Sequence, residues 1–213
     1  LKTIFFKKNE PKEGYTSLVS KENTYLNDLE IGRLRLGKKG DKFSGQTKNH
    51  ELLLEVLIGT CDITTKHSDS VKKFQSIGNR KNVFDSEPDS LLIGPNTEFD
   101  IFCTSESIDV LMPKVLLPED SSNYEPVIIK SKNVEIYEIG QGNFQRTVRV
   151  ILGGDGPAKR LRGGETINEK GQWSSWPRHS FDEHPELAKE FEEFFLYFTS
   201  PKDGYALQRA DGT

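Results

Sequence analysis

The chain contains little cysteine and little alanine. Its two cysteines, Cys61 and Cys103, lie far apart in a sequence of 213 residues and show no paired spacing. This pattern favours two buried thiols in a reducing compartment over a disulfide framework or a zinc knuckle. Alanine occurs four times and phenylalanine 13 times. Because alanine is the best helix former and aromatic residues fit pleated surfaces, the composition predicts a mostly β chain.

Long apolar runs and an excess of basic charge are also missing. The longest apolar runs, such as Leu52–Leu54 and Phe194–Phe198, are much shorter than the ~20 residues that a membrane helix needs. The first residues, Leu1–Lys8, lack the pattern of a signal peptide. We therefore expect no membrane association and a cytoplasmic location.

Lys and Arg number 29 against 33 Asp and Glu, a net charge of −4, which disfavours nucleic acid as a partner.

The length allows one large domain or two small ones, since domains commonly hold ~100–200 residues. Short apolar segments are separated by Gly, Asn, Asp and Pro, as strands joined by turns require. The predicted strands cover residues 31–36, 52–58, 71–77, 91–93, 99–104, 108–115, 134–139, 147–151, 163–167, 194–198 and 205–208. This spacing is typical of β-sandwiches and β-barrels. One helix is predicted over Asp182–Glu192, with Pro185 near its start, and an extended loop is the alternative there.

Two further patterns concern the organisation of the chain. Strict alternation over Val134–Ile139 predicts a strand with one buried and one exposed face. The polar segment Pro118–Pro126 is bounded by prolines and separates two β-rich blocks of similar size. It indicates a crossover between an N-terminal domain of residues 1–118 and a C-terminal domain of residues 119–213.

The densest group of polar and aromatic residues lies between Gly163 and Asp182 and contains both tryptophans. Such a concentration is typical of a lined pocket, or of a turn-rich hairpin whose tryptophans belong to the core. Four runs carry a family resemblance: G-E-T at 164–166, G-Q-W-S-S-W-P-R-H at 171–179, F-E-E-F-F-L-Y-F at 191–198 and G-Y-A-L-Q-R at 204–209. In order and spacing they resemble the 5-deoxy-glucuronate isomerases of inositol catabolism. That family also includes the related uronate isomerases of the pectin pathway.

Weaker similarity to this family covers residues 53–62, 91–102 and 145–149, so the resemblance spans nearly the whole chain. It implies an all-β bicupin, in which two small antiparallel, jelly-roll-like β-barrels lie in one chain. The N-terminal barrel is then structural, and the C-terminal barrel carries the site. Because the family continues past the strand that matches residues 204–209, the second barrel is expected to be incomplete in this sequence.

The activity implied by the resemblance is an aldose–ketose isomerisation of 5-deoxy-glucuronate to 2-deoxy-5-keto-gluconate. A divalent metal, zinc or manganese, is the cofactor that the family implies. Residue by residue, the family's metal and catalytic positions fall on His179 and Glu193. The second histidine of the family's His-x-His pair falls on Phe181, which cannot bind a metal. A compensating ligand from Asp182 or His184 is an open alternative.

The substrate implied by the resemblance is a small anionic sugar acid. Its carboxylate suits a guanidinium, which makes Arg146, Arg149, Arg178 and Arg209 candidates. Trp173 offers a face for sugar stacking and Gln208 a hydrogen-bonding amide. The alternatives for these residues are surface ion pairs and barrel packing.

Phe181 keeps a second class of function open. It favours a catalytically silent bicupin that has lost its metal site and acts as a sugar-acid-binding or regulatory protein. A third alternative is a metal-free isomerase in which Glu193 moves the proton. A homo-oligomer is expected because open barrel edges often pair.

Overall fold

The computed structural model describes residues 12–119, 121, 123–174 and 192–208. Its strands are β1 (Gly14–Val19), β2 (Leu29–Leu36), β3 (Lys42–Gln46), β4 (His50–Ile58), β5 (Cys61–His67), β6 (Ser70–Ile77), β7 (Ser90–Ile93), β8 (Glu98–Cys103), β9 (Ile108–Leu116), β10 (Val127–Ile129), β11 (Glu135–Ile139), β12 (Arg146–Leu152) and β13 (Gly163–Ile167). Two short 3-10 helices, η1 (Ser131–Asn133) and η2 (Gly142–Phe144), flank β11. Within these ranges, none of the helices has the length and apolar character to span a bilayer.

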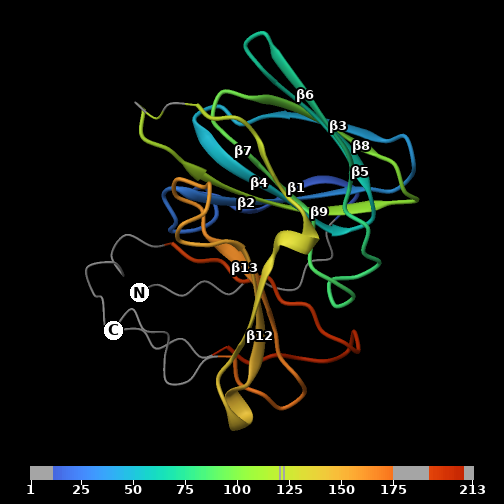
Figure 1. The fold of residues 1–213 in the computed structure, drawn as a ribbon, viewed down its shortest axis with the longest axis vertical. Helices are drawn as coiled ribbons and strands as arrows, with labels where there is room; N and C mark the ends of the chain where they lie inside the picture. Colours follow the sequence, from blue (N-terminus) through green and yellow to red (C-terminus); the bar gives the residue numbers. More distant parts are fainter. Residues whose placement is uncertain (1–11, 120, 122, 175–191, 209–213) are drawn as a thin grey trace.

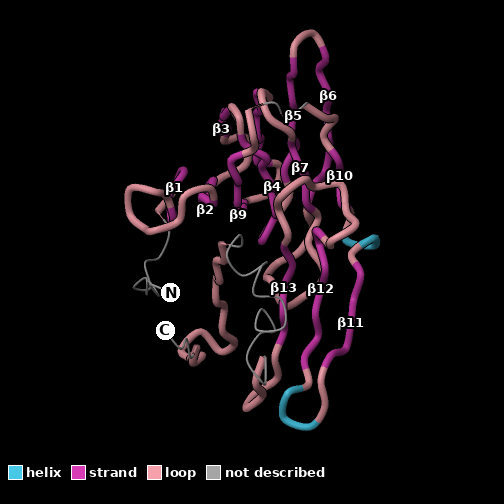
Figure 2. Tube along the Cα trace, turned by 90° about the vertical axis from the view of Figure 1, so that its left-hand side faces the viewer, coloured by secondary structure: helices cyan, strands magenta, loops and turns pink. Residues whose placement is uncertain are grey.

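The strands form three antiparallel sheets. A six-stranded sheet has the order β1-β2-β9-β4-β7-β10, a four-stranded sheet the order β3-β8-β5-β6, and a three-stranded sheet the order β11-β12-β13. The two larger sheets lie on each other in the upper part of Figure 1, and we call them the sandwich. The three-stranded sheet, here called the small sheet, extends away from the sandwich, with its strands side by side in Figure 2.

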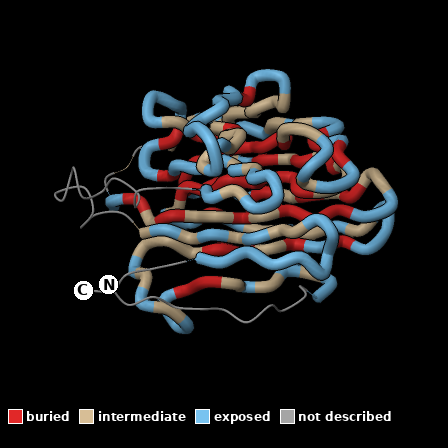
Figure 3. The backbone as a smooth tube through the Cα atoms, turned by 90° about the horizontal axis from the view of Figure 1, so that it is seen from below, coloured by how far each residue is buried: buried red, intermediate tan, exposed pale blue. Residues whose placement is uncertain are grey.

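The main core fills the space between the two sheets of the sandwich. Leu34 and Leu54 come from the six-stranded sheet, and Ile63 and Ile101 from the four-stranded one; none is more than 1% exposed. Buried residues accordingly run along the inner strands in Figure 3. The two cysteines are free and buried, as expected, and face each other across β5 and β8.

The central strand β4 is buried on both faces, which links the sandwich to the small sheet. Its inward residue Leu54 packs in the main core, whereas Leu53 belongs to a second apolar cluster with Ile151, Leu152 and Leu161. Those three residues come from β12 and the loop before β13. Because side chains alternate along a strand, Glu51 and Glu55 share the outer face of β4 with Leu53.

The predicted strands up to residue 167 are confirmed, and β1, β3, β5 and β10 are additional. The strands predicted at 194–198 and 205–208 are wrong, since those residues pair with no strand in the described part of the chain. Of the dry face predicted for Val134–Ile139 only Val134 is buried, at 7% exposure; the rest of it is wrong, because every residue of β11 is exposed at the edge of the small sheet. The predicted helix lies outside the described residues except for Glu192.

The predicted domain boundary between residues 118 and 119 stays a prediction. β10 follows that position in the chain and still pairs with β7 in the six-stranded sheet. Hydrogen bonding among the described strands keeps the sheets separate, so they do not close into a barrel. The all-β class is confirmed.

Candidate functional site

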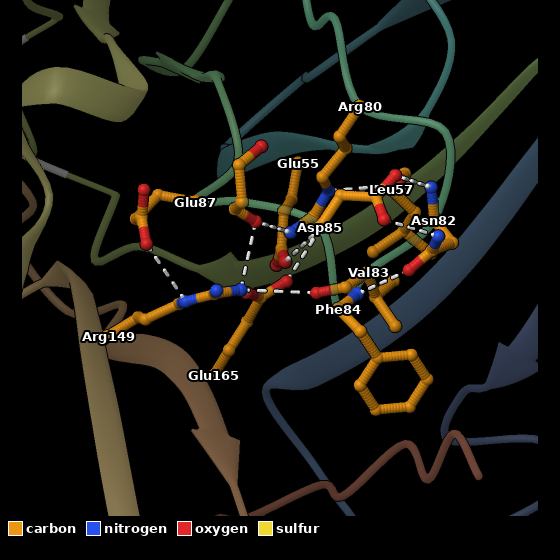
Figure 4. Close-up of polar contacts among 11 residues, drawn as sticks. Glu55, Leu57, Arg80, Asn82, Val83, Phe84, Asp85, Glu87, Arg149 and Glu165 are labelled. Carbon is orange, nitrogen blue, oxygen red and sulfur yellow. Dashed lines mark hydrogen bonds and ion pairs between the residues drawn. The ribbon is translucent and has the colours of Figure 1, made fainter. Parts of the chain in front are cut away.

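Charged side chains that are buried or partly buried gather where β12 and β13 meet the sandwich (Figure 4). The cluster contains Glu55 on β4, Arg80 after β6, Glu87 before β7, Arg149 on β12 and Glu165 on β13. The Arg80 guanidinium lies 2.6 Å from the Glu165 carboxylate and 3.8 Å from that of Glu55. The Arg149 guanidinium lies 3.1 Å from Glu165 and 3.2 Å from Glu87. We call these five residues the charge cluster.

Strand register and loop carbonyls build the charge cluster. Arg149 and Glu165 are directly opposite in the β12–β13 pair, where opposite charges attract across the ladder. Arg80 is held from the sandwich side, because it donates to the carbonyls of Leu57 at 2.9 Å and Ser86 at 3.0 Å. Arg149 donates to the same Ser86 carbonyl at 2.9 Å. The two guanidinium groups therefore tie the small sheet to the sandwich.

Burial changes the protonation of Glu55. Desolvation and the neighbouring Glu165 carboxylate raise the pKa of Glu55 from 4.5 to about 8, although Arg80 acts in the opposite direction. At neutral pH this carboxyl is then mostly protonated and uncharged. The two guanidinium charges are balanced by Glu87 and Glu165. A buried acid that keeps its proton can serve in proton transfer or in holding two parts of the fold together. The ion pairs of the charge cluster connect the sandwich with the small sheet, which favours the structural role.

A second carboxylate on the same face of β4 holds the loop between β12 and β13. Glu51 is 0% exposed. It accepts hydrogen bonds from the backbone amides of Lys159, Arg160 and Leu161 at 2.6, 2.9 and 2.7 Å. The Tyr124 hydroxyl donates to it at 2.6 Å. This carboxylate is fully occupied by the protein itself, so it has a structural role.

Four residues that were predicted for the site lie at or near the surface. Glu193 and Gln208 are exposed, Trp173 is 48% exposed and Arg146 is half-buried. Gln208 accepts a hydrogen bond from the Tyr197 hydroxyl at 2.7 Å, and Arg146 donates to a nearby backbone carbonyl at 3.4 Å. Among the described hydrogen bonds and ion pairs, none joins two of these four side chains. Their common role in one pocket stays a prediction.

The structure corrects the interpretation of Arg149 as a candidate for binding the substrate carboxylate. Its side chain is 8% exposed and is already engaged by Glu87 and Glu165. Arg178, His179 and Arg209 lie outside the described residues. The predicted convergence of His179 with Glu193 therefore stays a prediction.

The residues that the resemblance implies for a metal site do not make a complete ligand set. His179 and Glu193 supply two donors, and Phe181 supplies none. Catalytic zinc typically takes three protein ligands. Within the described ranges, no group of three or more His, Cys, Asp or Glu side chains is arranged to hold a metal ion. A metal held at these positions would need a further donor, for which Asp182 and His184 are the open alternatives in this sequence.

A pocket of about 160 Å³ lies away from the predicted site, on the sandwich. Its lining residues are His67, Asn123, Tyr124, Glu125 and Pro126. The polar groups there already have partners: His67 Nδ1 lies 2.9 Å from the Asn96 carbonyl oxygen, and Glu125 pairs with Lys72 at 2.8 Å. None of the residues predicted for the site lines this pocket.

Comparison with known proteins gives a consistent picture. A curated 5-deoxy-glucuronate isomerase of Halalkalibacterium halodurans is 29% identical over 195 residues, which is 90% of this chain and 68% of that protein. One from Bacillus subtilis (strain 168) has the same identity and coverage. One from Geobacillus thermodenitrificans is 28% identical over 80% of this chain and 60% of its own length. The chain thus spans 60% to 68% of these relatives.

The fold is also shared with a solved structure. An IolB-like protein of Salmonella typhimurium LT2 superposes with a TM-score of 0.69 at 21% identity, covering 78% of this chain and 60% of that one. This agreement confirms the cupin fold. The model of the KduI/IolB family matches residues 5–212. Since that match covers nearly the whole sequence, the chain belongs to the KduI/IolB family.

Proposed function

We propose that this chain belongs to a 5-deoxy-glucuronate isomerase of myo-inositol catabolism, an intramolecular oxidoreductase that interconverts an aldose and a ketose. The observation that carries the proposal is the continuous similarity to curated isomerases over 90% of the chain. The substrate is a small sugar acid. We further propose a cytoplasmic location and a homo-oligomer, with no nucleic acid or membrane partner.

The proposed reaction converts 5-deoxy-glucuronate into 2-deoxy-5-keto-gluconate by moving a proton between adjacent carbons through an enediolate. One group must take and return the proton, and the negative oxygen must be stabilised. We assign proton transfer to the Glu193 carboxylate, with His179 as its partner. Trp173 and Gln208 would contact the sugar. Both side chains are exposed, which leaves them accessible to a ligand.

The substrate carboxylate would be bound by a guanidinium group, because its two oxygens match the paired N–H groups. Of the candidates, Arg146 has one long hydrogen bond, at 3.4 Å, to a neighbouring carbonyl. Its guanidinium therefore has donors left for an anion. Arg178 and Arg209 are the other two candidates from the matching runs.

Zinc or manganese is the cofactor that family membership favours, as a Lewis acid for the enediolate oxygen. His179 and Glu193 would be its ligands, and because a metal-bound carboxylate is not free to take up a proton, the ligand and proton-transfer roles of Glu193 are alternatives. With Phe181 at a ligand position, tight binding requires another donor. The proton transfer assigned above involves only side chains of this chain.

Phe181 also supports a second candidate function. A benzyl group in place of an imidazole removes a ligand and fills the space beside it. The alternative is therefore a catalytically silent bicupin that binds a sugar acid or acts as a regulatory protein.

A turnover assay separates the two functions. The purified chain would be incubated with 5-deoxy-glucuronate, with added zinc or manganese and with a chelator, and the product followed by NMR. We expect turnover by the wild type and a loss of at least about 100-fold in Glu193→Gln, since general acid–base groups commonly contribute 10²–10⁴-fold. Glu98→Gln, at an exposed position on β8, is the matched control. Binding of the sugar acid without turnover in any metal condition would support the silent bicupin instead.

A further inference from the structure

The carboxylate of Glu192 is held by three consecutive backbone amides. The amides of Asn27, Asp28 and Leu29 donate to it at 2.6, 3.0 and 2.8 Å. These residues lead into β2 of the sandwich, more than 160 positions earlier in the chain. Hydrogen bonds from several N–H groups to one carboxylate are among the stronger polar contacts in proteins. Glu192 is thus fixed to the sandwich.

A second contact holds the same segment six residues further on. The Arg33 guanidinium lies over the Phe198 ring, 5.4 Å from its centre. Arg33 is itself fixed, because it donates two hydrogen bonds to the Asp109 carboxylate at 2.8 and 2.7 Å. The segment 192–198 therefore lies along β2 and is attached near both of its ends. Both contacts use side chains of the segment, Glu192 and Phe198, which explains how it docks without a strand ladder.

Exposure alternates along this segment. Glu192 is half-buried, Glu193 is exposed, and the residues that follow alternate in the same way up to Phe198. Neighbouring side chains of an extended chain point to opposite sides. Attachment of Glu192 to the sandwich therefore turns the Glu193 carboxylate away from it.

Asp28, whose amide binds Glu192, is itself held by a further ion pair. The Asp28 carboxylate pairs with the Arg160 guanidinium at 2.8 Å, and Arg160 also donates to the Leu116 carbonyl. The backbone amide of Arg160 is one of those that bind Glu51. The position of Glu192 is thus connected, through residues 28 and 160, to the fully buried Glu51 on β4.

We propose that Glu192 is a positioning residue. Its hydrogen bonds from the backbone amides of residues 27–29 fix the segment 192–198 on β2, and this sets the location and direction of the Glu193 side chain. The N-terminal half then takes part in the site through this contact. The inference rests on the proposed isomerase function, in which Glu193 transfers the proton.

The test uses the full chain and two measurements. The first is cleavage by chymotrypsin at Phe195 and Tyr197, two exposed aromatic residues of the segment. We expect cleavage about 10-fold faster in Glu192→Gln and faster still in Glu192→Ala, because proteolysis follows the population of the opened segment. The second is steady-state isomerase kinetics, in which kcat should fall about 10- to 100-fold, as expected for a misplaced catalytic group. KM should stay within about threefold of wild type.

Glu98→Gln is the control and should leave both measurements unchanged. Cleavage of Glu192→Gln at the wild-type rate would overturn the anchoring role. Faster cleavage with an unchanged kcat would overturn the positioning role. If the wild type shows no turnover, the proposed function fails, and the cleavage rates alone decide whether Glu192 fixes the segment.

Discussion

Folding transfers the Glu55 carboxyl from water into the charge cluster, where its pKa rises from 4.5 to about 8. Below pH 4.5 the folded and unfolded chains both hold this proton, so the contribution of Glu55 to stability is fully present. Between pH 4.5 and about 8 the unfolded chain releases the proton while the folded chain keeps it. The free energy of unfolding should therefore fall by up to about 1.4 kcal/mol per pH unit from this group.

We expect Glu55→Gln to remove this dependence, because the amide does not ionise and can still donate a hydrogen bond to Glu165. Urea unfolding between pH 4.5 and 8 should show the wild type losing stability relative to the variant as the pH rises. Glu98→Gln serves as the exposed control and should follow the wild type. A difference between wild type and Glu55→Gln that stays constant with pH would show that the Glu55 carboxyl titrates normally.

The sequence carried a signal for these buried carboxylates, although it could not name their partners. Glu51 and Glu55 stand four residues apart in a strand made otherwise of His, Leu, Val and Ile. That spacing puts them on one face, and a carboxylate buried in an apolar strand requires polar partners. The partners Arg80 and Arg160 come from loops far away in the chain. Only the three-dimensional arrangement shows that the outer face of β4 receives the small sheet.

At the scale of elements, apolar patterning predicted strands well where both a partner strand and a covering layer exist. β4 and β9 were found from their apolar residues because the sandwich buries them. β11 alternates apolar and polar residues but has no covering layer in the described part of the chain, so the dry face predicted from its alternation is absent from the strand. The segment 192–198 resembles a strand in composition, yet it is held by side chains. Pattern alone therefore could not distinguish a paired strand from a docked extended segment.

This difference between strands has a measurable consequence. Leu54 on β4 is 0% exposed, whereas Ile136 on β11 is 51% exposed. Leu54→Ala should lower the free energy of unfolding by about 2–5 kcal/mol, because it leaves a cavity in the main core. Ile136→Ala should change it by no more than about 0.5 kcal/mol. Urea denaturation of both variants measures this, and a loss at Ile136 as large as that at Leu54 would mean that β11 is covered in solution.

For the whole molecule, the small sheet and the sandwich share one apolar cluster and two polar joints. The apolar cluster joins Leu53 to Ile151 and Leu161. The two polar joints are the charge cluster and the hydrogen bonds from the backbone amides of residues 159–161 to the Glu51 carboxylate. The apolar cluster and both polar joints connect residues of the sandwich with residues of the small sheet or of the loop before β13. They should make the two parts unfold together, since separating them would expose the apolar cluster to water and break the ion pairs and hydrogen bonds between them.

The expectation of joint unfolding can be tested with the two tryptophans, both of which follow β13 in the chain. Their fluorescence reports on the C-terminal half, whereas far-UV circular dichroism is dominated by the strands of the sandwich. In the wild type the two urea transitions should coincide. Arg149→Met removes the positive charge from Glu87 and Glu165 and should cost about 3–5 kcal/mol. The fluorescence midpoint should then fall by about 1 M or more, ahead of the dichroism midpoint.

Arg146→Met is the matched control for this experiment, because Arg146 lies on the same strand and has a single long hydrogen bond to a carbonyl. It should leave both midpoints close to those of the wild type. If Arg149→Met behaved like Arg146→Met, the charge cluster would not be what joins the small sheet to the sandwich. The apolar cluster around Leu53 would then have to hold the two parts together by itself, and Leu161→Ala would separate the transitions instead.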